Sequence, residues 1–365
     1  MEKGINSSTL SPTMDICVGV YLFVVAWLSI MGNMLVIVMA YRRWSSLKAP
    51  ELLSVNLAVT DLCAALSTYP LTMVSAWNHR WLGGDGLCIY YGLMGFFLGV
   101  ASIMTLAVMA VVRFVSVNQQ ATRARISRRT VAMLCAGIWL YSLIWALFPV
   151  VGWGQYGPEP YGLSCSLAWA WMKEDSFPFV VTVFLFNLAL PTLTIVCCYF
   201  AISLKLYLIY RQSSGSRIPK TVKMHQRLLV IAVLISAGFI VSWSPYGMVS
   251  LWYVLRDGTS LPPEVTMLPC MLAKTSTMYN PLIYYAFNRS FRREVRRLLC
   301  GPGAGVCCAD AGVSHAADNK APDDRASPAS RENVRAVANF QLSDTRCHCP
   351  GTVDVEEGRS MELLF

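Results

Sequence analysis

The chain has 365 residues, of which 55% are hydrophobic and only 14% are charged, and its mean hydropathy is +0.48. Soluble domains carry about 25% charged residues, so this composition excludes an ordinary soluble protein and indicates a chain embedded in lipid. The formal net charge of +9 does not require a nucleic-acid partner, because basic loops that face anionic lipid account for it.

Seven apolar runs follow one another along the chain, and each can supply the roughly 20 residues that a helix needs to cross a hydrocarbon core. They cover residues 16–41, 52–77, 87–112, 131–151, 177–204, 228–254 and 265–286. The predicted fold is therefore an all-α membrane protein, a bundle of seven transmembrane helices over residues 16–286. A polar segment, 1–15, precedes the bundle and lacks a cleavable signal pattern, so we interpret the first run as a signal anchor.

Lysine and arginine gather in the segments that follow the first, third, fifth and seventh runs and are scarce in the segments between them. Because basic loops stay on the cytoplasmic side, the N-terminus is predicted outside and the C-terminus inside, in a multi-pass protein of the plasma membrane. Asn6 opens the triplet Asn6-Ser7-Ser8, a glycosylation acceptor that is usable only if the N-terminus is outside.

The segment after the seventh run, 287–300, combines arginines with apolar residues at helical spacing. This pattern predicts an amphipathic helix on the cytoplasmic leaflet, with membrane lipid as a partner and Cys300 as a palmitoylation site. Residues 301–365 are rich in Ala, Gly, Pro and Ser, which predicts a disordered cytoplasmic tail.

Two cysteines differ from those that lie within the apolar runs. Cys88 opens the third run and Cys165 lies in the long loop before the fifth. Both are therefore predicted on the outer, oxidising side of the membrane, where a disulfide bond between them is stable.

Asp61 and Lys274 are the fully charged side chains predicted deep inside the runs, where charges are costly and usually functional. At a helical rise of 1.5 Å per residue, Lys274 is roughly 15 Å from either surface, too far for its amine to reach water. A buried lysine amine is a nucleophile that forms Schiff bases with aldehydes, and retinal is an aldehyde with an apolar body. The residues alone leave an alternative open, in which Lys274 pairs with Asp61 as a conformational lock or in an ion pathway.

Several motifs stand in the order and spacing of the rhodopsin-like receptors, over about residues 32–291. They are Gly32-Asn33, the run 56–62 with Asp61, Trp139, Pro191, Tyr199, Trp243-Ser244-Pro245-Tyr246, and Asn280-Pro281 with Tyr284. The segment 272–284, which contains Lys274, resembles the seventh helix of the neuropsin-like opsins. The chain is thus similar to a family of non-visual light receptors.

The resemblance implies that Lys274 binds retinal, 11-cis or all-trans, as a Schiff base, with Trp243 and Tyr246 lining the same pocket. A protonated Schiff base needs a carboxylate counterion. In the vertebrate visual opsins this acid stands three residues after the third-helix cysteine, where this sequence has the pocket residue Tyr91. Glu159, six residues before the loop cysteine, matches the counterion of many bistable opsins; the alternative is a solvated loop glutamate.

The resemblance also implies a set of activation residues inside the bundle. They are Asn33, Asp61, Arg113, Tyr199, Asn280, Pro281 and Tyr284. Asn33, Asp61 and Asn280 are expected to form a polar cluster with water that rearranges, and the prolines of the fifth, sixth and seventh runs are expected to act as hinges.

The third run ends in Val112-Arg113-Phe114, where the family has an acid, an arginine and a tyrosine, so Arg113 lacks its acidic neighbour. We predict a light-activated receptor with no catalytic residues and no metal site, whose implied partners are a heterotrimeric G protein, arrestin and a receptor kinase. A retinal photoisomerase with little or no signalling is an alternative that the altered triplet keeps open. A receptor for a diffusible ligand is another, in which Lys274 is accidental. A microbial-type proton pump is excluded, because its third span carries aspartates and this run has none.

Overall fold

The computed structural model describes residues 7–118, 126–169, 172, 176–212, 220–256 and 261–300. The predictions for Asn6, for the side chain of Cys300 and for the tail after residue 300 lie outside these residues. One folding unit extends to Arg296, and the last turn of the final helix is the described part of a second unit, Arg297–Glu362.

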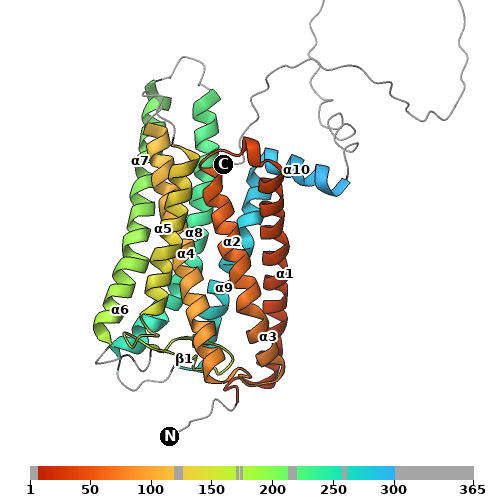
Figure 1. Ribbon diagram of the computed structural model, residues 1–365, viewed down its shortest axis with the longest axis vertical. Helices are drawn as coiled ribbons and strands as arrows, with labels where there is room; N and C mark the ends of the chain where they lie inside the picture. Colours follow the sequence, from red (N-terminus) through yellow and green to blue (C-terminus); the bar gives the residue numbers. More distant parts are fainter. Residues whose placement is uncertain are drawn as a thin grey trace, which may run out of the picture. The chain divides into compact units, whose positions relative to one another are not determined.

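The apolar runs form the helices of a membrane bundle (Figure 1). Their bounds are α1 (Pro12–Arg42), α2 (Glu51–Ser67), α3 (Tyr69–Trp77), α4 (Gly84–Asn118), α5 (Arg128–Leu147), α6 (Phe177–Phe184), α7 (Leu190–Gln212), α8 (Lys220–Leu255) and α9 (Pro263–Phe287). The short helix η1 (Trp44–Ser46) follows α1, the π-helical η4 (Leu185–Ala189) joins α6 to α7, and α10 (Arg289–Cys300) follows α9.

Six spans among the described residues are long and apolar enough to cross a membrane: α1, α2 with α3, α4, α5, α6 with α7, and α8. α9 is the seventh helix of the bundle, and Lys274 and Asn280 dilute its apolar character. Large apolar side chains on the outer faces of the bundle are exposed, among them Trp27, Phe200 and Val241. Such a surface is stable in lipid and not in water.

Several helix bounds differ from the expected runs for local reasons. α4 and α8 extend beyond residues 87–112 and 228–254, because a helix continues into its polar ends after it leaves the hydrocarbon. The run 52–77 is split at Thr68, since Pro70 in the first turn of α3 has no backbone N–H to donate. α5 ends at Leu147, short of residue 151, and Pro149 follows within two residues.

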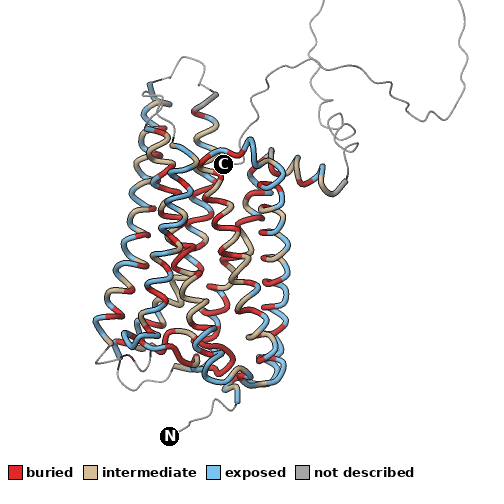
Figure 2. The backbone as a smooth tube through the Cα atoms, in the orientation of Figure 1, coloured by how far each residue is buried: buried red, intermediate tan, exposed pale blue. Residues whose placement is uncertain are grey.

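The buried residues of the bundle lie on the helix faces that point inward (Figure 2). α4 contacts α2, α5 and α7, and α9 packs between α1 and α8. At the opposite end of the bundle from α10 lies a hairpin of β1 (Tyr156–Pro158) and β2 (Cys165–Leu167), in which Pro158 is paired with Cys165 (Figure 1).

The hairpin packs against α4 and is held from the other side by the start of the chain. Thr9 donates a backbone hydrogen bond to the carbonyl of Tyr161, and Ser8 donates one to the carbonyl of His79. Gly162 turns the hairpin with φ of 77°, and a Cβ there would lie 2.9 Å from the carbonyl oxygen of Ser7. This end of the bundle is therefore closed by two chain segments.

Candidate functional site

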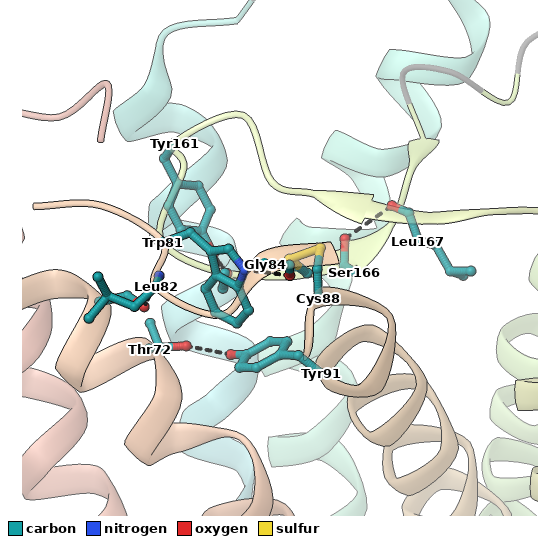
Figure 3. Close-up of a disulfide and its surroundings, with 12 residues drawn as sticks. Thr72, Trp81, Leu82, Gly84, Cys88, Tyr91, Tyr161, Ser166 and Leu167 are labelled. Atoms are coloured by element: carbon teal, nitrogen blue, oxygen red, sulfur yellow. Dashed lines mark hydrogen bonds between the residues drawn. A yellow bond between two sulfur atoms is a disulfide. The ribbon is translucent and has the colours of Figure 1, made fainter. Parts of the chain in front are cut away.

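The predicted disulfide between Cys88 and Cys165 is confirmed (Figure 3). It joins the first turns of α4 to β2, with the two Cα atoms 5.4 Å apart, and both cysteines are buried beside Trp81 and Tyr91. The bond fixes the hairpin above the interior of the bundle, and the position of the hairpin in turn sets where Glu159 lies.

Lys274 lies inside the bundle on α9, and its amine has an aromatic environment. The Nζ atom donates a hydrogen bond to the Tyr91 hydroxyl at 2.8 Å. The same hydroxyl is bonded to Thr72 at 2.6 Å, as Figure 3 shows. The amine is also 5.1 Å from the ring centroid of Tyr91 and 5.5 Å from that of Tyr69, within the range of cation–π attraction.

The alternative pairing of Lys274 with Asp61 is not formed. Asp61 is buried and accepts a hydrogen bond at 2.8 Å from the side-chain amide of Asn280. The described residues contain no ion pair between Lys274 and Asp61, and the amine is directed at Tyr91 instead. An amine without a carboxylate in direct contact remains available for reaction with an aldehyde.

Glu159 directly follows β1 and is buried, with 7% of its surface exposed. Its Oε1 accepts a hydrogen bond from the Tyr246 hydroxyl at 2.9 Å, and Trp169 donates to that hydroxyl at 3.1 Å. Burial raises the pKa of Glu159, and the hydrogen bond from Tyr246 and the charge of Lys274 oppose this rise. The alternative of a solvated loop glutamate is therefore wrong, whereas the counterion role stays a prediction.

A cavity of about 120 Å³ lies between the helices and is lined by both Lys274 and Glu159. Its walls are mostly apolar and aromatic, and they come from α2, α3, α4, the hairpin, α8 and α9. The site thus combines one amine and one carboxyl group with an otherwise apolar interior.

Trp243 and Tyr246, expected on one face of their helix, both line this cavity. Their ring centroids are 6.2 Å apart in an edge-to-face arrangement, and the Trp243 indole donates to Ser276 of α9 at 3.2 Å. On the facing helix, α4, a Cβ at Gly99 would lie 3.1 Å from the indole ring. The absence of a side chain at Gly99 leaves space for this ring.

Tyr69, Trp169 and Phe239 are among the lining residues that were not predicted from the sequence. Phe239 stacks on Trp243 with ring centroids 5.6 Å apart, and its place one turn before Trp243 was a usable signal. Trp169 had no such signal, because it follows the hairpin and its position depends on how that loop folds.

The expected polar cluster of Asn33, Asp61 and Asn280 with water stays a prediction. Asp61 and Asn280 are hydrogen-bonded, but Asn33 is not bonded to either of them. The Asn33 amide donates to the carbonyls of Ser29 and Thr277, so it joins α1 to α9. The bond to this α9 carbonyl, at 2.8 Å, uses the side-chain amide of Asn33 as a donor, and Asn33 therefore does not donate to Asp61 or Asn280.

Trp139, one of the sequence landmarks, has a structural role between three helices. Its indole donates to the side-chain oxygen of Asn56 at 2.8 Å, and the Asn56 amide donates to Thr105 at 2.8 Å. These bonds connect α5, α2 and α4.

Arg113 is hydrogen-bonded to a backbone carbonyl, and the position before it, where the family has an acid, is Val112. Its Nη1 donates to the carbonyl of Leu228 on α8 at 2.8 Å. Its Nε is buried and has no hydrogen-bond partner among the described residues. Val112 is 3% exposed and packs in an apolar cluster with residues such as Leu53 and Ile138. Among the described residues, this contact between α4 and α8 therefore exists without an ion pair.

The remaining activation residues lie between helices near this contact. The Tyr199 hydroxyl of α7 is 3.4 Å from Ser236 of α8, and Tyr284 packs on Phe291 of α10 with ring centroids 6.1 Å apart. Pro245 and Pro281 lie inside α8 and α9, and Pro191 lies in the first turn of α7, directly after the π-helical turn. Their roles as hinges stay predictions.

The fold and the cavity define a membrane receptor with a ligand site inside its helical bundle. Residues 32–284 match the family described as "7 transmembrane receptor (rhodopsin family)". Opsin-5 of Homo sapiens is 35% identical over 290 residues, which cover 78% of this chain and 82% of that protein.

Visual pigment-like receptor peropsin of Homo sapiens is 30% identical, over 80% of this chain and 87% of the relative. The crystal structure of squid rhodopsin superimposes with a TM-score of 0.73 at 26% identity, covering 82% of this chain and 88% of that one. The chain belongs to the rhodopsin family of seven-transmembrane receptors, and within that family to the opsins.

Proposed function

We propose that this protein is a light-sensing G-protein-coupled receptor that holds retinal as a Schiff base on Lys274. The observation that carries the proposal is the Lys274 amine, which lines a largely apolar cavity and has no carboxylate bonded to it among the described residues. Bound retinal supplies the absorption of light and a light-driven change of shape. The amine supplies the point of attachment, since an unpaired lysine in an apolar pocket reacts with aldehydes.

The residues of the cavity fit this ligand. The lining is aromatic and aliphatic for most of its extent, as an apolar polyene requires. The hydroxyl of Tyr91 lies beside the reactive nitrogen and remains a hydrogen-bond partner for it after the amine is modified.

Glu159 is the candidate counterion. It lines the same cavity as Lys274, and Tyr246 and Trp169 orient its carboxyl group. Tyr91 occupies the position at which vertebrate visual opsins carry their acid, and a phenol is a neutral partner. A positive nitrogen on Lys274 therefore depends on Glu159 for an anion.

Trp243 connects the cavity to the helices that must move. Its ring contacts Phe239 and Tyr246 on α8, and its indole nitrogen is bonded to Ser276 on α9. Pro245 lies two residues further along α8, where a proline weakens the helix ladder. A change in the cavity thus acts on α8, the helix whose other end accepts the hydrogen bond of Arg113.

The same proposal includes the cell-biological setting. The basic segments place the end with α10 at the cytoplasmic side of the plasma membrane, with the N-terminus outside. A heterotrimeric G protein would bind between the cytoplasmic ends of the helices. A receptor kinase and arrestin would act on the serine-bearing tail. Anionic lipid would contact the arginines of α10.

An absorption spectrum tests this function. Membranes that contain the full chain are incubated in the dark with 11-cis and, separately, with all-trans retinal. We expect a pigment band at a longer wavelength than the absorption maximum of free retinal. We also expect light-dependent nucleotide exchange on at least one class of G protein. A pigment without exchange on any class, combined with release of a different retinal isomer after light, would establish the photoisomerase instead. No pigment with either isomer would refute the proposal.

A further inference from the structure

The cavity has a second lobe that extends away from Lys274 towards η4. Eight residues line this lobe and not the part that contains the amine, among them Val183, Phe184, Asn187, Leu188 and Ser250. Both parts share Gly95, Phe96, Gly99, Trp169, Phe239, Trp243 and Tyr246, so the two spaces adjoin along these residues. A ligand attached to Lys274 therefore has the second lobe available for its far end.

Asn187 is a polar side chain turned into this lobe from an apolar helix. It lies in the π-helical turn Leu185–Ala189, and the other four residues of that turn are not buried. π-Helical turns are rare and occur frequently at functional sites. Asn187 is 6% exposed, and neither its amide oxygen nor its amide nitrogen has a hydrogen-bond partner among the described residues.

Ser250 presents a third unpartnered polar atom to the same lobe. It lies on α8 and is 2% exposed, and its hydroxyl has no partner within the described part of the chain. Buried polar groups are nearly always hydrogen-bonded in folded proteins, so a pair of unpaired side chains from two helices on one cavity requires an explanation. Thr192 also carries an unpartnered hydroxyl, but it does not line the lobe.

The chemistry of the missing partner follows from the groups present. An amide offers two donors and an acceptor, and a hydroxyl offers one donor and an acceptor. The lining of the lobe contains no lysine, arginine, histidine or acidic residue. An ionised ligand group would therefore be left without a counter-charge, and the lobe suits a neutral oxygen such as an alcohol or a ketone.

We propose that Asn187 and Ser250 form a subsite for a neutral oxygen on the ring end of the retinoid, so that the receptor prefers a ring-oxygenated retinal to retinal itself. This inference rests on the proposed function, because Lys274 fixes the aldehyde end of the ligand. A site that hydrogen-bonds a ligand oxygen discriminates against an analogue without it, since its own buried polar groups are then left unpaired.

Competition between two aldehydes tests the proposal. Membranes with the full chain are incubated in the dark with an equimolar mixture of 11-cis retinal and its 3-hydroxy derivative. The adducts are reduced with borohydride, and their ratio is measured by mass spectrometry. We expect the hydroxylated adduct to prevail by roughly tenfold in the wild type, the effect of one to two hydrogen bonds. Asn187→Leu and Ser250→Ala should each bring the ratio towards one.

Thr192→Val is the matched control, because it removes an unpartnered hydroxyl outside the lobe and should keep the wild-type ratio. Thermal unfolding of the retinoid-free variants reports whether they fold. If Asn187→Leu does not fold, the adduct ratio of Ser250→Ala, which is the smaller change, decides whether the subsite exists. Equal uptake of the two aldehydes by the wild type would overturn the subsite and assign these polar atoms to water. A preference that persists in both variants would also overturn it. Failure of either aldehyde to form an adduct would refute the proposed function itself, a result distinct from equal uptake.

Discussion

We expect the hydrogen bond from Arg113 to the Leu228 carbonyl to set how firmly the resting state is held. A hydrogen bond from a charged group to a neutral acceptor contributes about 1.5 to 3 kcal/mol. Removing one partner of a buried ion pair costs about 3 to 5 kcal/mol. The midpoints of these two ranges differ by about 1.8 kcal/mol, and the largest difference between them is about 3.5 kcal/mol. An acid beside Arg113 is therefore expected to hold the resting state more firmly, by roughly 20-fold at the midpoints and by at most about 400-fold in population.

Val112→Glu is predicted to lower the basal activity of the dark, retinal-free protein by a factor within that range. The introduced carboxylate can accept from Nε of Arg113, which is buried and has no partner among the described residues. Opposing this gain, the carboxylate enters the apolar cluster in which Val112 is 3% exposed, so some loss of expression is expected.

Nucleotide exchange on purified G protein, normalised to receptor at the cell surface, measures the effect. Val112→Gln is the matched control, because it has nearly the size of glutamate and no charge. We expect a clear reduction of basal exchange with glutamate, little reduction with glutamine, and normal pigment formation in both. Equal effects of the two substitutions, or a wild-type apoprotein with no basal exchange, would show that the Arg113 contact does not limit the resting state.

Three further predictions concern the walls of the cavity. Cys88→Ala should reduce surface expression because it frees the hairpin from α4, and a thiol label that reacts at Cys88 in intact wild-type protein would contradict the disulfide. Glu159→Gln should move the pigment from visible to ultraviolet absorption at neutral pH, whereas an unchanged spectrum would indicate another anion. Gly99→Val should lower the pigment yield because the new side chain meets Trp243. Gly137→Val is the control and should leave the yield unchanged, because a Cβ there meets nothing within 4 Å. Equal yields of the two variants would show that the fit at the indole is loose.

The helices could be predicted from the sequence because lipid imposes a simple requirement. A span must be apolar for about 20 residues and must satisfy its own backbone, so hydropathy located all seven. Hydropathy falls where a helix leaves the lipid, even if the helix continues. For this reason the polar ends of α4 and α8 were not predicted. The break at Thr68 is a local effect of Pro70, and a hydropathy value averaged over the whole run does not reveal it.

The site was predictable where it depends on charge and not where it depends on tertiary contacts. Lys274 was found because a charge deep in a span is rare. Its contact with Tyr91, and the missing bond between Asn33 and Asp61, depend on the packing of three helices. Asn187 escaped notice because it is uncharged, and a search for ionisable residues does not find it.

The attachment of retinal to Lys274 is the central claim, and trapping of the bond tests it most directly. The dark pigment is reduced with borohydride, digested, and the modified peptide identified by mass spectrometry, in the wild type, in Lys274→Ala and in the control Lys205→Ala, whose amine is bonded near the end of α4. We expect a retinyl group on Lys274 in the wild type and in the control, and none in Lys274→Ala. A retinyl group on another residue of the wild type, or an adduct that persists in Lys274→Ala, would contradict it.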